Sequence, residues 1–153
     1  MNNVITAALL ALALSGCTPP PLAPAPPVSL SERARLEFGG GWEPDRRERR
    51  SMARALDLAE RAYLALEGGS APRVSRVILY PGWRLPAEVS ARVPGTLRGM
   101  CEWGAAGSTI HLATGGRWPM LAAPHELRHA RIGDPDHERS GWRAVDRIGR
   151  WSF

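Results

Sequence analysis

Residues 125–137 read HELRHARIGDPDH and contain three of the four histidines in the chain. His125 and His129 are four positions apart, and residues at this spacing lie on one face of an α-helix with Cβ atoms about 5–6 Å apart. Both imidazoles can therefore direct a nitrogen at one ion, at the roughly 2.0–2.1 Å that zinc prefers. Glu126 projects beside such an ion, where its carboxylate can reach a water molecule. The spacing predicts a zinc site on a helix.

The residues around this motif predict where the helix begins and ends. Pro124 is compatible with a helix that begins near Leu121, because the N–H groups of a first helical turn have no partner within the helix. Gly133 suits a C-terminal cap, and the sequence GDPD that follows is typical of a tight turn. We expect the chain to fold back here and return toward the ion.

Three residues of this turn are candidates for the third metal ligand: Asp134, Asp136 and His137. His137 is the preferred third ligand, because imidazole suits zinc and the two aspartates can instead orient the histidines. Asp134 and Asp136 remain open as alternative ligands. With three protein ligands, zinc would keep a fourth position for water.

This arrangement resembles the zincin metallopeptidases, in which a helix with the HExxH motif packs under a small sheet whose edge strand lines the substrate cleft. The resemblance covers roughly residues 96–151 and is specific only in the motif. It implies that His125 and His129 bind zinc and that Glu126 acts as the general base.

The residues after the motif narrow the resemblance. Metzincins have a glycine and a histidine three and six positions after the second motif histidine, whereas this chain has Ile132 and Pro135 there. Gluzincins take a glutamate from a later helix, and Glu138 is too close to match them. The pattern is more similar to SprT-like and related small zincins, in which a turn leads to a third histidine and then an aromatic residue. His137 and Trp142 occupy those places.

Other polar side chains are candidates for supporting roles. His111, in the segment STIHLA, could line the cleft and stabilise an oxyanion, or have a structural role in a strand. Arg131 and Tyr80 are weaker candidates for the same task. Cys101 is expected to be a small buried residue, although its thiolate could also serve as a ligand.

The N-terminus has the features of an export signal. Val4 to Leu14 is an apolar run of eleven residues, long enough for a signal-peptide core and short for a membrane span. It ends in Leu14-Ser15-Gly16-Cys17, which resembles a bacterial lipobox. That resemblance implies cleavage before Cys17 and a lipid on its sulfur. The alternative is an ordinary small-residue cleavage site in which Cys17 is incidental.

The chain therefore divides into three parts: a signal peptide at 1–16, a lipidated cysteine with a proline-rich tether at 17–28, and a zincin-like domain at 29–153. Thr18 to Val28 contains six prolines and no charge, which favours an extended tether of about 30 Å. Thr18 stands where an aspartate would favour inner-membrane retention in Gram-negative lipoproteins. We expect an extracytoplasmic protein anchored to the bilayer through Cys17, on the periplasmic face of an outer membrane if the cell is Gram-negative.

Two functions that use a metal fit these features, and a third, an envelope-tethering lipoprotein whose arginine-rich helix contacts anionic polymer, needs none. The first is a zinc metallopeptidase that hydrolyses peptide bonds of a peptide or protein substrate, with Glu126 as the base. The alternative is a non-catalytic envelope lipoprotein that zinc stabilises. A structural zinc site would be closed by a fourth protein ligand such as Cys101 or His111, whereas a catalytic site would stay open to water.

The hydrophobic pattern of residues 29–153 predicts an α+β domain with a short, mainly antiparallel sheet. Ser29 and Glu32 have the spacing of a capping box, ahead of a short helix that ends by Gly39. The other predicted helices are a long one from Pro44 and Asp45 to Gly68, the motif helix, and a C-terminal one at 140–151. Strands are predicted at 74–80, 96–103 and 108–113.

The charge of the chain is carried by arginine, since there is no lysine and the formal net charge is +5. Nucleic-acid binding is not expected, because the arginines do not form a stripe with interleaved aromatic residues. Five of them stand early in the long predicted helix, at positions 46, 47, 49, 50 and 54. They form either a solvated helix face or a contact with an anionic surface such as phospholipid, lipopolysaccharide or cell-wall polymer.

Overall fold

The structure, a computed structural model, describes residues 28–91, 97–115 and 122–151. Its helices are α2 (Leu30–Arg33), α3 (Arg46–Glu67), α4 (Ala87–Ser90), α5 (Ala123–Ile132) and α6 (Trp142–Trp151), and its strands are β1 (Arg35–Phe38), β2 (Val74–Tyr80), β3 (Gly99–Glu102) and β4 (Ser108–Ala113). The predicted signal peptide, Cys17 and the tether up to residue 27 lie outside the described residues. None of the helices in these ranges is long and apolar enough to cross a membrane.

The four strands form one sheet in the order β1-β2-β4-β3. β1 and β2 pair in parallel, as do β2 and β4, whereas the edge strand β3 pairs antiparallel with β4. The α+β prediction is confirmed, but the prediction of a mainly antiparallel sheet was wrong. The 22-residue α3 carries the chain from the end of β1 back to the start of β2, and such a crossover produces parallel neighbours.

The first predicted helix is shorter than expected and gives way to a strand. Ser29 N–H donates to the Glu32 carboxylate at 3.1 Å, as a capping box requires, but α2 ends at Arg33. Ala34 is already extended, and β1 follows. Leu36 and Phe38 are two residues apart and pack against the core, so burial favours a strand here over continuation of the helix.

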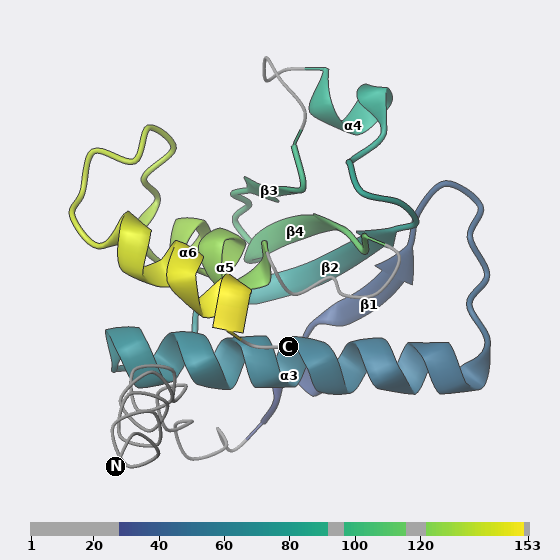
Figure 1. Cartoon of the computed structure of the whole chain (residues 1–153), viewed down its shortest axis with the longest axis horizontal. Helices are drawn as coiled ribbons and strands as arrows, with labels where there is room; N and C mark the ends of the chain where they lie inside the picture. Colours follow the sequence, from purple (N-terminus) through teal and green to yellow (C-terminus); the bar gives the residue numbers. More distant parts are fainter. Residues whose placement is uncertain (1–27, 92–96, 116–121, 152–153) are drawn as a thin grey trace, which may run out of the picture.

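The long helix α3 spans the molecule along one face of the sheet (Figure 1). Its start is fixed by the Asp45 carboxylate, which accepts hydrogen bonds from the N–H groups of Arg47 and Glu48. The core lies between α3, α5 and the sheet, and its fully buried side chains include those of Tyr63, Leu79, Leu112 and Leu127. Each of these three leucines contributes about 1.5–3 kcal/mol by leaving water.

Helix α5 packs on α3 and against the edge strand β3, and α6 packs on α5 and α3. Figure 1 shows α5 and α6 together over the C-terminal half of α3. The other face of the sheet carries a smaller apolar cluster of Tyr80, Leu85 and Ala113, which Val89 of α4 helps to cover. The two faces of the sheet therefore have separate environments, and the motif helix belongs to only one of them.

Candidate metal centre

Helix α5 presents His125 and His129 on one face, as their spacing predicts. Pro124 lies in its first turn, and Gly133 ends it in a left-handed conformation with φ 60°, donating its N–H to the His129 carbonyl. The Nε2 atoms of His125 and His129 are 3.1 Å apart. The predicted Gly133 cap is thus confirmed.

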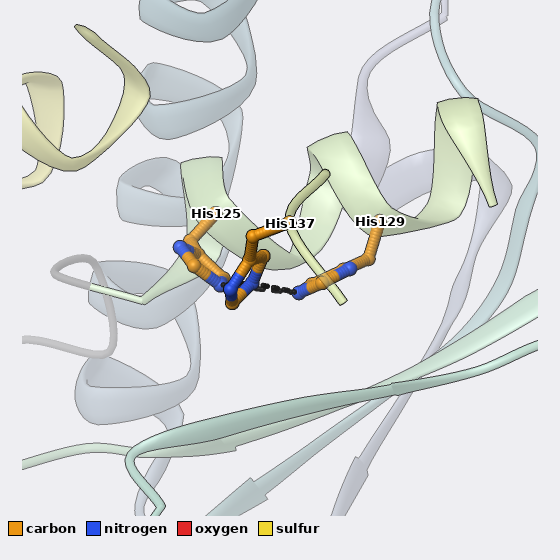
Figure 2. A group of neighbouring side chains, drawn as sticks. All are labelled: His125, His129 and His137. Atoms are coloured by element: carbon orange, nitrogen blue, oxygen red, sulfur yellow. Dashed lines mark hydrogen bonds between the residues drawn. The ribbon is translucent and has the colours of Figure 1, made fainter. Parts of the chain in front are cut away.

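His137 reaches the same point from the loop between α5 and α6. Its Nε2 is 3.1 Å from Nε2 of His125 and 3.1 Å from Nε2 of His129, and the three rings converge in Figure 2. The backbone of His137 has a φ of 59°, a left-handed conformation that costs a non-glycine residue on the order of 1 kcal/mol. Such a conformation persists only when the surrounding structure imposes it.

Asp134 imposes this loop geometry. Its carboxylate accepts hydrogen bonds from the N–H of Arg139 at 3.0 Å, the N–H of Glu138 at 3.3 Å and the Trp142 indole at 3.2 Å. These donors, the Arg139 N–H foremost, hold the pKa of the Asp134 carboxyl below its ordinary value. Asp134 therefore organises the loop that carries His137, and its carboxylate is engaged away from the histidine nitrogens.

The hydrogen bonds of the imidazoles determine which nitrogens carry protons. His129 Nδ1 lies 2.8 Å from the Asp134 carbonyl oxygen, which can only accept, so Nδ1 is the donor. His125 Nδ1 lies 2.7 Å from a carboxylate oxygen of Asp146 in α6 and donates likewise. In the neutral rings the Nε2 atoms of both histidines therefore present lone pairs.

Burial keeps His129 neutral. Loss of water around the ring, with the neighbouring His125 second, lowers the pKa of His129 to about 4. At neutral pH its Nε2 lone pair points at the Nε2 atoms of the other two histidines. Three imidazole nitrogens that converge in this way are suited to bind a metal ion.

The spacing of the nitrogens passes a simple test for metal binding. Tetrahedral angles with bonds of 2.0–2.1 Å would place two ligand nitrogens about 3.3 Å apart, close to the 3.1 Å separations found for all three pairs. Within the described residues, the metal-binding group consists of His125, His129 and His137. These three histidines could bind a metal ion.

Trp142 and Arg128 fix this group against the rest of the fold. The Trp142 ring lies 4.3–4.8 Å from each of the three imidazole centroids. The Arg128 guanidinium lies over the Trp142 ring at 5.0 Å, and it donates to the Glu67 carboxylate at the end of α3 and to the Ser140 carbonyl. Arg128 thus ties α3, α5 and the loop before α6 together.

Glu126 points toward the edge strand and is 4% exposed. A Cβ at Gly99 of β3 would lie only 2.6 Å from the Glu126 carboxylate, so the missing side chain at Gly99 makes room for it. Burial, then the charge of Asp146, raises the pKa of Glu126 to about 8. In the part of the chain that the structure describes, its carboxylate has no hydrogen-bond or ion-pair partner.

Several sequence-predicted residues are not brought to this centre. His111 lies on the opposite face of the sheet, where its ring contacts the Tyr80 hydroxyl at 3.1 Å and the Glu102 carboxylate at 3.3 Å. The structure therefore places neither His111 nor Tyr80 where an oxyanion at the histidines could be reached. Arg131 donates to the Gly68 carbonyl at 2.6 Å and joins α5 to the end of α3.

Asp136 and Cys101 also lie apart from the three nitrogens. Asp136 is exposed and does not belong to the metal-binding group. Cys101 packs against the main core, and burial, with the charge of Glu126 second, raises the pKa of its thiol to about 12. Cys101 is not among the residues whose ligand atoms converge with those of the three histidines.

Sequence reasoning missed four contributors: Asp146, Arg128, Gly99 and Trp103. The Trp103 indole donates to the His129 carbonyl at 2.9 Å and is half exposed beside the His129 ring. Asp146 stands in the predicted last helix, but its contact depends on how α6 packs on α5, which no local pattern specifies. Arg128 occupies a variable position of the motif, so only its burial reveals its role. Gly99 had no turn signal around it.

Comparison of the chain with protein-family models, with curated proteins and with solved structures found no match.

The contact between Asp146 and His125 generates a first prediction. Asp146→Asn should weaken binding of a metal ion at the three histidines by about 10–100-fold, because an amide supports the Nδ1 proton of His125 less well than a carboxylate does. Competition with a fluorescent chelator measures this affinity. Asp136→Asn, which removes an exposed carboxylate from the same region, is the matched control, and an equal loss in both variants would contradict a specific role of Asp146.

The buried carboxylate of Glu126 generates a second prediction, for the metal-free protein. Because the pKa of Glu126 is about 8 in the folded chain and near 4.5 when unfolded, stability falls as pH rises between these values. Glu126→Gln removes this pH-dependent loss of stability. It should raise the free energy of unfolding by roughly 3 kcal/mol at pH 7, with little effect at pH 4.5.

Urea unfolding of the metal-free proteins at pH 4.5, 6 and 7 provides the measurement. Glu138→Gln, at an exposed carboxylate, should show no such pH-dependent gain. A gain for Glu126→Gln that is the same at all three pH values would show that desolvation of the charged carboxylate is not its cause.

Proposed function

We propose that this protein is a zinc-dependent metallopeptidase, in which His125, His129 and His137 hold the ion and Glu126 is the general base. The observation that carries the proposal is the convergence of three Nε2 atoms, each 3.1 Å from the other two, on the helix face next to a buried carboxylate. A bound zinc ion would act as a Lewis acid and make water acidic enough to ionise near neutral pH.

The side chains of the chain supply the remaining steps. The Glu126 carboxylate accepts a proton from the attacking water and returns it to the nitrogen of the leaving amine. Its position on the same helix as His125 and His129 is suited to both transfers. Asp146 and the Asp134 carbonyl hold the Nδ1 protons, which keeps the two helical imidazoles oriented.

The positions of the alternative ligands favour catalysis over a purely structural zinc. His111 faces the opposite side of the sheet, and Cys101 is packed in the core with its proton retained, so neither is placed to complete the coordination. The edge strand β3 lies beside α5, and its free edge could pair with the backbone of an extended peptide. The proposed substrate is therefore a peptide or an extended protein segment.

We further propose that the protein acts outside the cytoplasm, anchored to a bilayer by an acyl chain on Cys17. The support comes from residues 1–28, where an apolar run precedes Leu14-Ser15-Gly16-Cys17 and a proline-rich segment follows. The tether would hold the domain about 30 Å from the lipid.

The zinc and base assignments predict different results for two substitutions. The full chain should bind one equivalent of zinc, measured by elemental analysis, and His137→Ala should lose most of it. Glu126→Gln should keep the zinc but lose at least about a hundredfold in cleavage of a pool of quenched fluorescent peptides. His111→Ala, outside the centre, is the matched control for both readouts. Cleavage by Glu126→Gln at the parent rate would overturn the role of Glu126, and a zinc-free parent would overturn the whole proposal.

The anchor generates a separate prediction. In a bacterial host, Cys17→Ser should prevent acylation and move the full chain from the detergent phase to the aqueous phase on Triton X-114 partition, with loss of the lipid mass from the intact protein. Cys101→Ser is the control and should partition like the parent. An unchanged mass and partition for Cys17→Ser would mean that Cys17 carries no lipid.

A further inference from the structure

The first half of α3 carries an uncompensated positive face, defined here as the arginine face: Arg46, Arg47, Arg50 and Arg54, all exposed. Within the described residues none of these four side chains has a carboxylate partner. By contrast, Arg33, Arg76 and Arg128 are each paired with a glutamate. An open hollow of about 560 Å³ lies against the arginine face, with Leu58 at its border.

This arrangement does not serve the stability of the helix. The N-terminus of a helix carries a partial positive charge, so cations in its first turns are unfavourable, and like charges four positions apart, as at Arg46, Arg50 and Arg54, repel one another. An anionic partner would remove both costs. The arginine face is therefore better explained by binding than by folding.

The arginine face points away from the core and from the metal centre. At 100° per residue its four members span about 100° of the helix circumference, on the side opposite the buried Met52, Leu56 and Tyr63. The metal centre is tied to the other end of α3 through Arg128 and Glu67. Figure 1 shows α5 and α6 over that other end. A partner on the arginine face would thus leave the histidines accessible.

The attachment of the N-terminal segment brings this face within reach of a membrane. Ser31 of α2 binds Asp57 of α3 through both its N–H and its hydroxyl, at 2.9 Å each. Asp57 lies on the same side of α3 as Arg50 and about 16 Å from Arg46 along the axis. The tether from Cys17 to this point spans about 30 Å when extended, so a bilayer that holds Cys17 can also touch the arginine face.

We propose that the arginine face of α3 docks on a membrane surface that contains anionic, phosphate-bearing lipids. Guanidinium groups bind phosphate oxygens through paired hydrogen bonds, and several of them on one helix face match a plane of lipid phosphates better than they match one soluble ion. Leu58 at the border is exposed, and its burial on docking would add apolar contact with the interface. The docking requires neither zinc nor peptide hydrolysis. That the arginine face can reach the bilayer rests on the proposed anchor at Cys17.

The experiment measures vesicle binding by the full chain with Cys17→Ser, so that no acyl chain contributes. Phosphatidylcholine vesicles with 30% phosphatidylglycerol are compared with phosphatidylcholine alone, and the difference between them reports on anionic lipid. Neutralising the arginine face with Arg46→Gln, Arg47→Gln, Arg50→Gln and Arg54→Gln should reduce this difference by roughly a thousandfold, given the contribution expected of each arginine near such a surface. High salt should have the same effect on the parent.

A charge-matched control removes four other exposed arginines, through Arg73→Gln, Arg84→Gln, Arg143→Gln and Arg147→Gln. This variant should keep most of the preference for anionic vesicles. Equal losses in the two fourfold variants would show that net charge alone drives binding. No preference in the parent, or tighter binding to soluble heparin than to vesicles, would also overturn the proposal. Circular dichroism and zinc content, expected to be unchanged in both variants, separate this result from misfolding and from failure of the metal centre.

Discussion

The constraint on which the centre depends is the double role of Asp134, at the point where the chain leaves α5. Its backbone carbonyl accepts the Nδ1 proton of His129, and its carboxylate accepts from Arg139 and Trp142 in the segment that follows. One residue therefore orients the His129 ring on the helix and shapes the loop that presents His137. The left-handed backbone of His137 is maintained by the same contacts.

Much of this fold follows from local sequence signals. The two strands with clear alternation, Val74–Tyr80 and Ser108–Ala113, and the long capped helix α3 lie where the pattern predicts. β1 was missed because a capping box just before it favours a helix. Leu36 and Phe38 are at positions i and i+2 and lie on one face of a strand, but only their contact with the core reveals this. The parallel pairing of most strands was also missed. It depends on where α3 returns the chain to the sheet, and the local pattern does not specify that place.

The candidate site also combines residues that the sequence marks with residues that only the tertiary structure brings in. His125, Glu126, His129 and His137 were singled out because their chemistry and spacing appear in the sequence itself. Asp146 and Gly99 contribute through contacts between elements that are distant along the chain, and neither is marked by its neighbours. For His111 the sequence left a cleft role and a structural role open, and in the structure this strand histidine faces the other side of the sheet. Side-chain alternation in β4 separates it from the motif helix.

The buried guanidinium of Arg128 suggests how a histidine site built in this way could be detected in other sequences. Within HELRH, the position before the second histidine is nominally free, yet here it joins the end of α3 to the loop before α6 and supports the Trp142 ring. A Cβ at Gly141 would lie about 3 Å from this guanidinium, so the glycine and the arginine are geometrically matched. A useful signature for chains built in this way would therefore be longer than the five-residue motif: an acidic residue closing the preceding long helix, HExRH, and Gly-Trp at the start of the last helix.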